Sequence, residues 1–151
     1  MSSARPVVLA GAVLAAAWLG ACAARAVSPA SSEGPLRVAA GEPFTLAPGE
    51  RAVIQGLEVE VVFRGVESDS RCPRGVTCVW AGDAAVAVVV RAAGKDEPAQ
   101  LHTHLDPKNV TIAGARIELM GVTPYPSTEA KIEAKDYRAT LRAEAAEGGG
   151  R

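Results

Sequence analysis

Residues 57–64 read Leu57-Glu58-Val59-Glu60-Val61-Val62-Phe63-Arg64, and this stretch decides the fold class. Apolar side chains occupy every second position, and most of the positions between them are charged. An extended chain points alternate side chains to opposite faces, so the pattern predicts a β-strand with one buried face and one wet face.

The same period recurs along the chain. Residues 84–90 place valines on one face and small or branched side chains on the other, which predicts a central strand covered on both sides. Further strands are predicted at residues 44–46, 52–54, 101–105, 117–122 and 137–142. Pro48 and Gly49 supply a turn that makes the first two a short hairpin or one bent strand. Residues 127–135 lack an apolar face and are expected to form a loop or one helical turn.

These strand candidates recur about every 10 to 15 residues, and no strand–helix alternation lies between them. The sequence therefore predicts an all-β fold, an antiparallel β-sandwich of about seven strands. A small β-barrel is the alternative.

Composition fits one ordinary globular domain: 151 residues with 48% hydrophobic and 22% charged side chains. Sixteen lysine and arginine residues stand against seventeen acidic residues, which gives a net charge of -1. Without an excess of basic residues the chain lacks the positive electrostatic potential that attracts a polyanion. Composition therefore argues against a nucleic-acid partner.

Residues 1–21 are predicted to be a lipoprotein signal peptide. Arg5 precedes an uncharged apolar run of 13 residues at 7–19, which is shorter than the roughly 20 residues that cross a bilayer. The run ends in Leu19-Gly20-Ala21-Cys22, which resembles the bacterial lipobox. That resemblance implies cleavage just before Cys22, a diacylglyceryl group on its sulfur and an acylated amino terminus. The alternative is an ordinary signal peptidase site at Ala21-Cys22-Ala23.

The number of cysteines favours the lipobox. The chain has three, and Cys72 and Cys78 lie six apart with proline and glycine between them. In an exported chain this spacing predicts a disulfide that closes a short loop between two strands, and assigning Cys22 to lipid leaves an even number. The expected organisation after the signal peptide is a flexible tether at 22–37, a β-sandwich domain at 38–144 and a disordered tail at 145–151.

The cysteine pair lies in the most distinctive stretch of the chain. Asp69 is expected to cap a turn through its side chain, and Arg71 to pair with it or with solvent. Trp80 is expected to pack as a large hydrophobic anchor at the end of the sandwich; the alternative is an exposed platform for a sugar or a peptide. A closed loop carrying Arg74 also has the geometry of a protease-inhibitor loop.

The full string is Asp69-Ser70-Arg71-Cys72-Pro73-Arg74-Gly75-Val76-Thr77-Cys78-Val79-Trp80-Ala81-Gly82. Together with the amphipathic strand before it and the Val/Ala and Tyr-x-Ala-x-Leu strands after it, this string resembles a group of small bacterial exported proteins and lipoproteins that has no assigned function. The resemblance covers most of residues 42–143. It implies a single β-rich extracytoplasmic domain and carries over no catalytic or ligand-binding residue.

A second cluster reads His102-Thr103-His104-Leu105-Asp106. On a strand, His102, His104 and Asp106 would share one face and could meet a zinc or copper ion. The alternative is the wet face of a strand whose other face enters the core. A zinc or copper ion needs three or four ligands, and the sequence offers no candidate ligands for it beyond this local cluster.

No enzyme motif occurs: the chain lacks G-x-S-x-G, H-E-x-x-H and the P-loop. The sequence predicts a lipid-anchored protein of the bacterial cell envelope, facing the periplasm or the cell surface, that binds an envelope protein or a small ligand without catalysis. The alternatives are a lipoprotein that binds a divalent metal through His102 and His104, and a protease-inhibitor-like loop at 72–78. No cofactor is expected, except that the metal-binding alternative would require zinc or copper.

Overall fold

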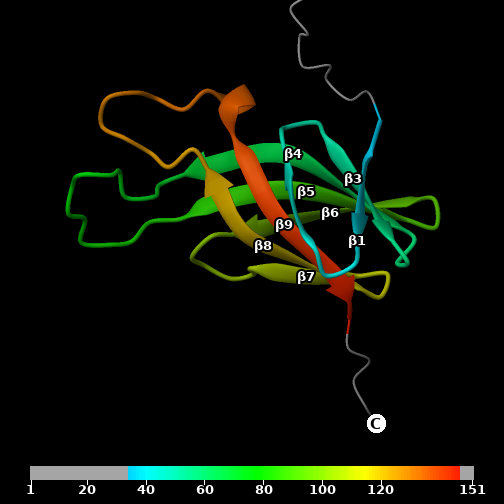
Figure 1. Cartoon of the computed structure of the whole chain (residues 1–151). Helices are drawn as coiled ribbons and strands as arrows, with labels where there is room; N and C mark the ends of the chain where they lie inside the picture. Colours follow the sequence, from blue (N-terminus) through cyan, green and yellow to red (C-terminus); the bar gives the residue numbers. More distant parts are fainter. Residues whose placement is uncertain (1–33, 147–151) are drawn as a thin grey trace, which may run out of the picture. The chain divides into compact units, whose positions relative to one another are not determined.

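The computed structural model describes residues 34–146, which form nine β-strands in two sheets (Figure 1). The first sheet has the order β1 (Leu36–Ala39), β3 (Arg51–Gln55), β4 (Val59–Asp69), β5 (Ala84–Ala92) and β6 (Lys95–His102). The second has the order β2 (Pro43–Leu46), β9 (Arg138–Ala145), β8 (Ala115–Thr123) and β7 (Asn109–Ile112). Within 34–146 the one helical element is the 3-10 turn η1 (Ala134–Asp136), and no helix there is long and apolar enough to cross a membrane.

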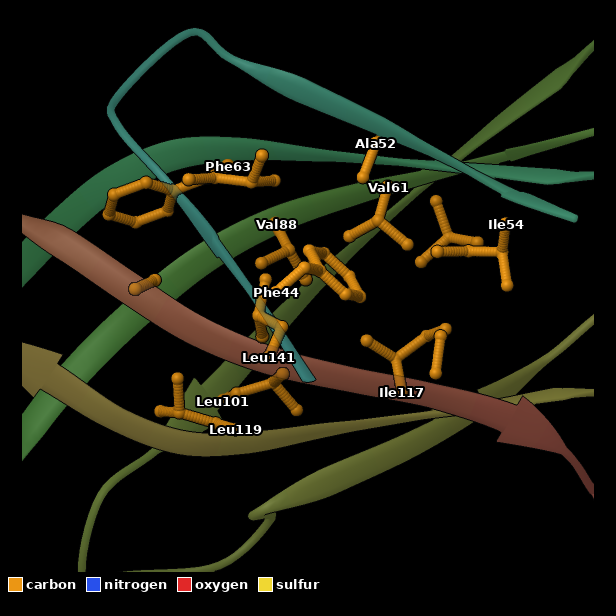
Figure 2. Close-up of a cluster of buried hydrophobic side chains, with 14 of the residues drawn as sticks. Phe44, Ala52, Ile54, Val61, Phe63, Val88, Leu101, Ile117, Leu119 and Leu141 are labelled. Atoms are coloured by element: carbon orange, nitrogen blue, oxygen red, sulfur yellow. The ribbon is translucent and has the colours of Figure 1, made fainter. Parts of the chain in front are cut away.

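Side chains from both sheets form one hydrophobic core (Figure 2). The alternation predicted from the sequence is realised in β4, where Val59, Val61 and Phe63 are buried. The largest fully buried side chains from the other strands include Leu46, Ile54, Leu101, Ile117 and Leu141. The prediction of an all-β sandwich is confirmed. Each sheet keeps two edge strands, so the alternative of a closed barrel is wrong.

Strand pairing is antiparallel except between β1 and β3, which run parallel. The predicted hairpin at residues 44–54 is wrong because β2 and β3 belong to different sheets. β2 pairs with β9, so that Phe44 lies opposite Leu141, whereas β3 pairs with β1 and β4. The turn at Pro48 and Gly49 therefore carries the chain from one sheet to the other.

The structure also adds two strands to the predicted seven and moves several strand ends. The strand predicted at 101–105 is misplaced, because it shares only residues 101 and 102 with β6. β1 and β7 have four residues each, too few for a period of two to be recognised in the sequence. β1 begins at Leu36, inside the segment predicted to be a tether at 22–37. β5 pairs with β4 and β6, as expected for an internal strand, but Ala87 and Val89 on its outer face are only half-buried. The prediction that both of its faces are covered is therefore wrong.

The predicted signal peptide, Cys22, most of the predicted tether and the last five residues of the predicted tail lie outside the described residues. The tail was expected to begin at residue 145, but β9 includes Ala145.

The connections between strands fall into two kinds, one at each end of the sandwich. Two to three residues make the connections at 40–42, 56–58, 93–94 and 113–114, which we call the tight-turn end. Longer connections at 47–50, 70–83, 103–108 and 124–137 make the long-loop end. Leu36 pairs with Ala52, which pairs with Val61, and β4 then runs on to the long-loop end. Because β1 runs parallel to β3, which follows the connection at 47–50, the chain enters β1 from the side of the long-loop end, at the level of Val61.

We expect Leu141→Ala to lower the free energy of unfolding by about 3 kcal/mol, because Leu141 is fully buried and its removal leaves a cavity. Urea denaturation followed by circular dichroism measures the change. Met120→Ala is the control in the same sheet: the Met120 side chain is 52% exposed, so its loss is expected to be within about 0.5 kcal/mol. Similar losses in the two variants would contradict the core described here.

Candidate functional site

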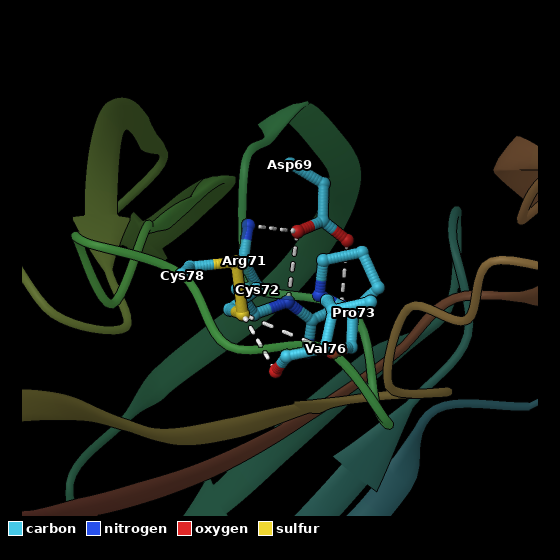
Figure 3. The surroundings of a disulfide bond; sticks show 6 residues. All are labelled: Asp69, Arg71, Cys72, Pro73, Val76 and Cys78. Atoms are coloured by element: carbon cyan, nitrogen blue, oxygen red, sulfur yellow. Dashed lines mark hydrogen bonds and ion pairs between the residues drawn. A yellow bond between two sulfur atoms is a disulfide. The ribbon is translucent and has the colours of Figure 1, made fainter.

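The connection between β4 and β5, residues 70–83, extends beyond both sheets at the long-loop end (Figure 1). We call it the stapled loop, because the predicted disulfide between Cys72 and Cys78 closes it (Figure 3). The two Cα atoms are 6.0 Å apart, within the ordinary range for a disulfide. The disulfide therefore closes a covalent ring at 72–78 within the loop, and Val79 and Trp80 follow this ring.

Asp69 and Arg71 form a bidentate ion pair where the stapled loop begins (Figure 3). Arg71 donates from Nε to Oδ1 at 2.9 Å and from Nη2 to Oδ2 at 2.6 Å. The backbone N–H of Arg71 also donates to Oδ1 at 3.1 Å, so the predicted turn cap and pairing are confirmed. The pair is not at the surface: the two side chains are only 5% and 7% exposed. A buried ion pair depends on complete hydrogen bonding, which an exposed pair does not need.

The Arg71 guanidinium supplies that bonding by reaching the chain that leaves the second sheet. Nη1 donates to the carbonyl of Val122 at 2.5 Å, and Nη2 donates to the carbonyl of Pro124 at 3.0 Å. Tyr137, the last residue before β9, donates from its hydroxyl to Oδ2 of Asp69 at 3.1 Å. The start of the stapled loop is therefore joined to both ends of the 124–137 connection.

The ionisation of this cluster follows from its contacts. Burial raises the pKa of Asp69, but hydrogen bonds from the side chain and backbone of Arg71, the charge of Arg71 and the bond from Tyr137 together lower it below its usual value. Burial and the negative charge of Asp69 raise the pKa of Tyr137. At neutral pH the cluster thus holds an ionised carboxylate and a protonated phenol.

Arg74, predicted to be a binding residue, contributes to a second junction. Its backbone N–H donates to the carbonyl of Pro126 at 3.0 Å, and Arg74 forms a parallel bridge with Ser127. The guanidinium carbons of Arg71 and Arg74 lie 5.1 and 5.5 Å from the centre of the Tyr125 ring. Both distances allow cation–π attraction. The stapled loop therefore contacts the 124–137 connection through both its backbone and its side chains.

The stapled loop ends at Gly82 and Asp83. Gly82 has a φ of 69°, and a Cβ there would lie 1.9 Å from the carbonyl oxygen of Ser70. Only glycine allows the two strands of the neck to approach this closely. The backbone N–H of Ser70 donates to the carbonyl of Asp83 at 2.7 Å, and the Ser70 hydroxyl donates to the same oxygen at 3.0 Å.

The Asp83 carboxylate organises the neighbouring 103–108 connection. Oδ2 lies 2.6 Å from Nδ1 of His102, and Oδ1 accepts from the Thr103 hydroxyl at 3.1 Å. Oδ1 also accepts from the backbone N–H groups of His104, at 2.8 Å, and Leu105, at 3.3 Å. Burial raises the pKa of Asp83, but these hydrogen bonds outweigh it and lower the pKa to about 2. Sequence reasoning missed Asp83, although an aspartate between a glycine and a buried strand was a signal available to it.

The predicted metal cluster is not formed. β6 ends at His102, so His104 and Asp106 lie on an exposed connection and do not continue the face that a longer strand would share. The His102 ring is bound to Asp83 and, through Nε2, lies 3.2 Å from Oε1 of Gln100. Among residues 34–146 no three histidine, cysteine, aspartate or glutamate side chains are grouped to hold a metal ion. The expectation of a site at His102, His104 and Asp106 is therefore corrected.

The expectation that Trp80 is a buried anchor is also wrong. Trp80 is 82% exposed and Val79 is 90% exposed, and Val76 is exposed as well. The physical reason is that the loop extends beyond both sheets, so neither sheet covers these side chains. Their exposure agrees with the alternative prediction, in which Trp80 lies on an exposed platform.

No family model, curated protein or solved structure matches this chain. The geometry of the long-loop end is therefore the basis for the functional argument. Two features define it: a neck fixed by Asp69, Arg71, Gly82 and Asp83, and exposed apolar side chains beyond that neck.

We expect Arg71→Met to lower the free energy of unfolding by about 3 to 5 kcal/mol, because it leaves the Asp69 carboxylate buried without its charged partner. Urea denaturation at neutral pH measures the loss. Arg64→Met is the matched control, because it makes the same substitution at an exposed arginine on β4, the strand that leads into the stapled loop. A loss no greater than that of the control would show that the ion pair does not support the neck.

Asp83 makes stability dependent on pH. Its folded pKa, about 2, lies below the ordinary value of 3.8, so the carboxylate stabilises the fold above pH 3.8 and loses that contribution as the pH falls through 2. The full contribution is about 2 kcal/mol. We expect Asp83→Asn to be less stable at neutral pH and to show a shallower decline in urea midpoint between pH 5 and pH 2.

Asp106→Asn, which removes an exposed carboxylate from the adjoining connection, is the control for this pH series. It should keep the decline of the unmodified protein. If Asp83→Asn declined as steeply as this control, Asp83 would not be the group responsible.

Proposed function

We propose that this protein is a lipid-anchored component of the bacterial cell envelope that acts by binding, without catalysis, through the stapled loop. The observation that carries the proposal is the exposure of Val79 and Trp80 on a loop whose neck is fixed. Apolar side chains that extend into water gain free energy when a partner covers them, and tryptophan is among the residues that contribute most at binding surfaces.

The rigid neck favours binding because little conformational entropy remains to be lost. The disulfide, the bond from Arg74 to Pro126 and the close approach of Gly82 to Ser70 each restrict the loop before a partner arrives. A preorganised loop keeps more of its contact free energy as affinity.

The proposed location rests on the N-terminal sequence and on the cysteines. The lipobox-like Leu19-Gly20-Ala21-Cys22 supplies the anchor, and the pairing of the other two cysteines leaves Cys22 as the remaining thiol. A structural disulfide supports an oxidising compartment outside the cytoplasm.

The geometry favours binding over the alternatives. The carboxylates of Asp69 and Asp83 are held ionised by their hydrogen bonds, so neither is suited to give up a proton near neutral pH. The protease-inhibitor alternative is weakened because the backbone of Arg74 is bound to Pro126 and bridged to Ser127. An inhibitor loop must instead present its backbone to the protease.

Intact mass of the protein purified from its native membrane tests the anchor. We expect a chain that begins at Cys22 and carries added acyl groups, with two alkylation sites that appear only after reduction. Cys22→Ser should lack the acyl groups and leave the membrane fraction. A water-soluble product of the unmodified gene that begins after Ala23 or Ala24 would overturn the proposal.

A further inference from the structure

We propose that the partner of the stapled loop is the lipid bilayer itself, and that Val79 and Trp80 insert into the interface of the membrane that holds the anchor. This inference rests on the proposed function, because it uses the anchor at Cys22. Three observations support it: where the exposed apolar side chains lie, where the chain enters the sandwich, and the chemistry of the loop.

Exposed apolar side chains concentrate at one end of the sandwich. Of the seven large hydrophobic side chains exposed among residues 34–146, five lie on the long connections: Val76, Val79, Trp80, Leu105 and Tyr125. The other two are Leu36, at the start of β1, and Met120, on β8. The tight-turn end has none among the described residues. Exposed apolar side chains that gather at one end of the domain favour a partner that contacts the domain from that side alone. A membrane surface is such a partner.

The chain enters the sandwich from that same end. Thirteen residues separate Cys22 from Leu36, and a flexible segment of that length would have an average end-to-end distance of about 20 Å. Leu36 pairs with Ala52, and Ala52 pairs with Val61, so Leu36 and Val61 lie at the same height in the sheet. From Val61, β4 continues for eight residues, about 25 Å, to Asp69. Asp69 is where the loop begins, so Val79 and Trp80 project farther from the level of Leu36 than this average span of the connecting segment. An anchor at Cys22 would bring the stapled loop to the membrane surface.

The loop has the chemistry of a membrane interface. Arg74 is the only charged residue between Pro73 and Gly82, and no acidic residue is present there to oppose insertion. Tryptophan prefers the headgroup region because its ring is apolar and its N–H is polar. Arg74 lies within the disulfide-closed ring, with its guanidinium beside Tyr125, and a guanidinium is suited to pairing with a lipid phosphate.

A bilayer also fits the size of the exposed surface better than a protein partner does. Stable protein interfaces bury about 800 Å² on each partner, more than three exposed side chains on one loop supply. An anchored loop needs less, because the anchor already raises its effective concentration at the bilayer. Membrane contact by a small apolar loop is thus sufficient when the chain is tethered.

The fluorescence of Trp80 can report whether the loop is inserted in lipid. The chain has two tryptophans, Trp18 and Trp80, and cleavage before Cys22 removes the former. The mature lipidated protein is placed in phosphatidylcholine vesicles with and without bromine on the acyl chains. We expect brominated lipid to quench Trp80 fluorescence and aqueous iodide to quench it weakly.

Val79→Ser and Met120→Ser form a matched pair of variants. Val79→Ser should lower the ratio of inserted to free loop about tenfold, seen as loss of quenching by brominated lipid. Met120→Ser, which changes an exposed residue outside the stapled loop, should leave quenching unchanged. Both substitutions are at exposed positions, so neither is expected to unfold the protein.

The inference is overturned if Trp80 of the acylated protein stays open to iodide and insensitive to brominated lipid. It is equally overturned if Trp80 is open in pure lipid vesicles but protected in native membranes, because that result identifies a protein partner. An intact mass without acyl groups on Cys22 would instead overturn the proposed function, so the two failures are distinguishable.

Discussion

The buried ion pair of Asp69 and Arg71 is the constraint on which the long-loop end depends. A guanidinium in a water-poor position must have its charge compensated and its N–H groups bonded, since an unpaired buried charge is strongly unfavourable. Arg71 meets this requirement only when Asp69 at the end of β4 and the carbonyls of Val122 and Pro124 converge on it. The pair therefore fixes how the two sheets' connections leave the sandwich relative to each other.

Asp83 has the corresponding role where the stapled loop returns to the first sheet. Like Asp69, its carboxylate accepts several hydrogen bonds from side chains and backbone, and it thereby shapes the neighbouring 103–108 connection. One carboxylate at each end of the loop, together with the disulfide within it, restricts the conformation of the loop where it leaves and rejoins the first sheet. That rigidity explains why Val79 and Trp80 remain exposed although burial would favour both.

Sequence reasoning succeeds where the determining interactions are local. The period of two identifies the positions of β4, β5, β8 and β9, and the spacing of Cys72 and Cys78 is enough to predict their bond. It misplaces β6, whose mostly exposed residues show no such period. It fails for β1 and β7, whose four residues are too few to show a period. It also fails for the assignment of β2 and β3 to different sheets, which depends on partners distant in the chain.

The two errors at the candidate site have the same origin. His102 and His104 share a strand face only if the strand continues, and it ends at His102, where Asp83 from 19 residues earlier binds the ring. The burial of Trp80 depends on where the loop leaves the sandwich, which Arg71 determines through contacts more than 50 residues away. Local sequence draws attention to Asp83 itself, but it indicates neither that His102 is its partner nor which carbonyls Arg71 reaches.

The rest of the surface explains why the long-loop end is the part available for contact. The free strands β1, β2 and β7 are four residues long, and short edges offer few groups for pairing with another sheet. The fourth edge strand, β6, begins Lys95-Asp96-Glu97-Pro98, and its charges and proline oppose the addition of a strand. A fold that protects its sheet edges in this way and yet exposes a tryptophan on a rigid loop directs association to that loop.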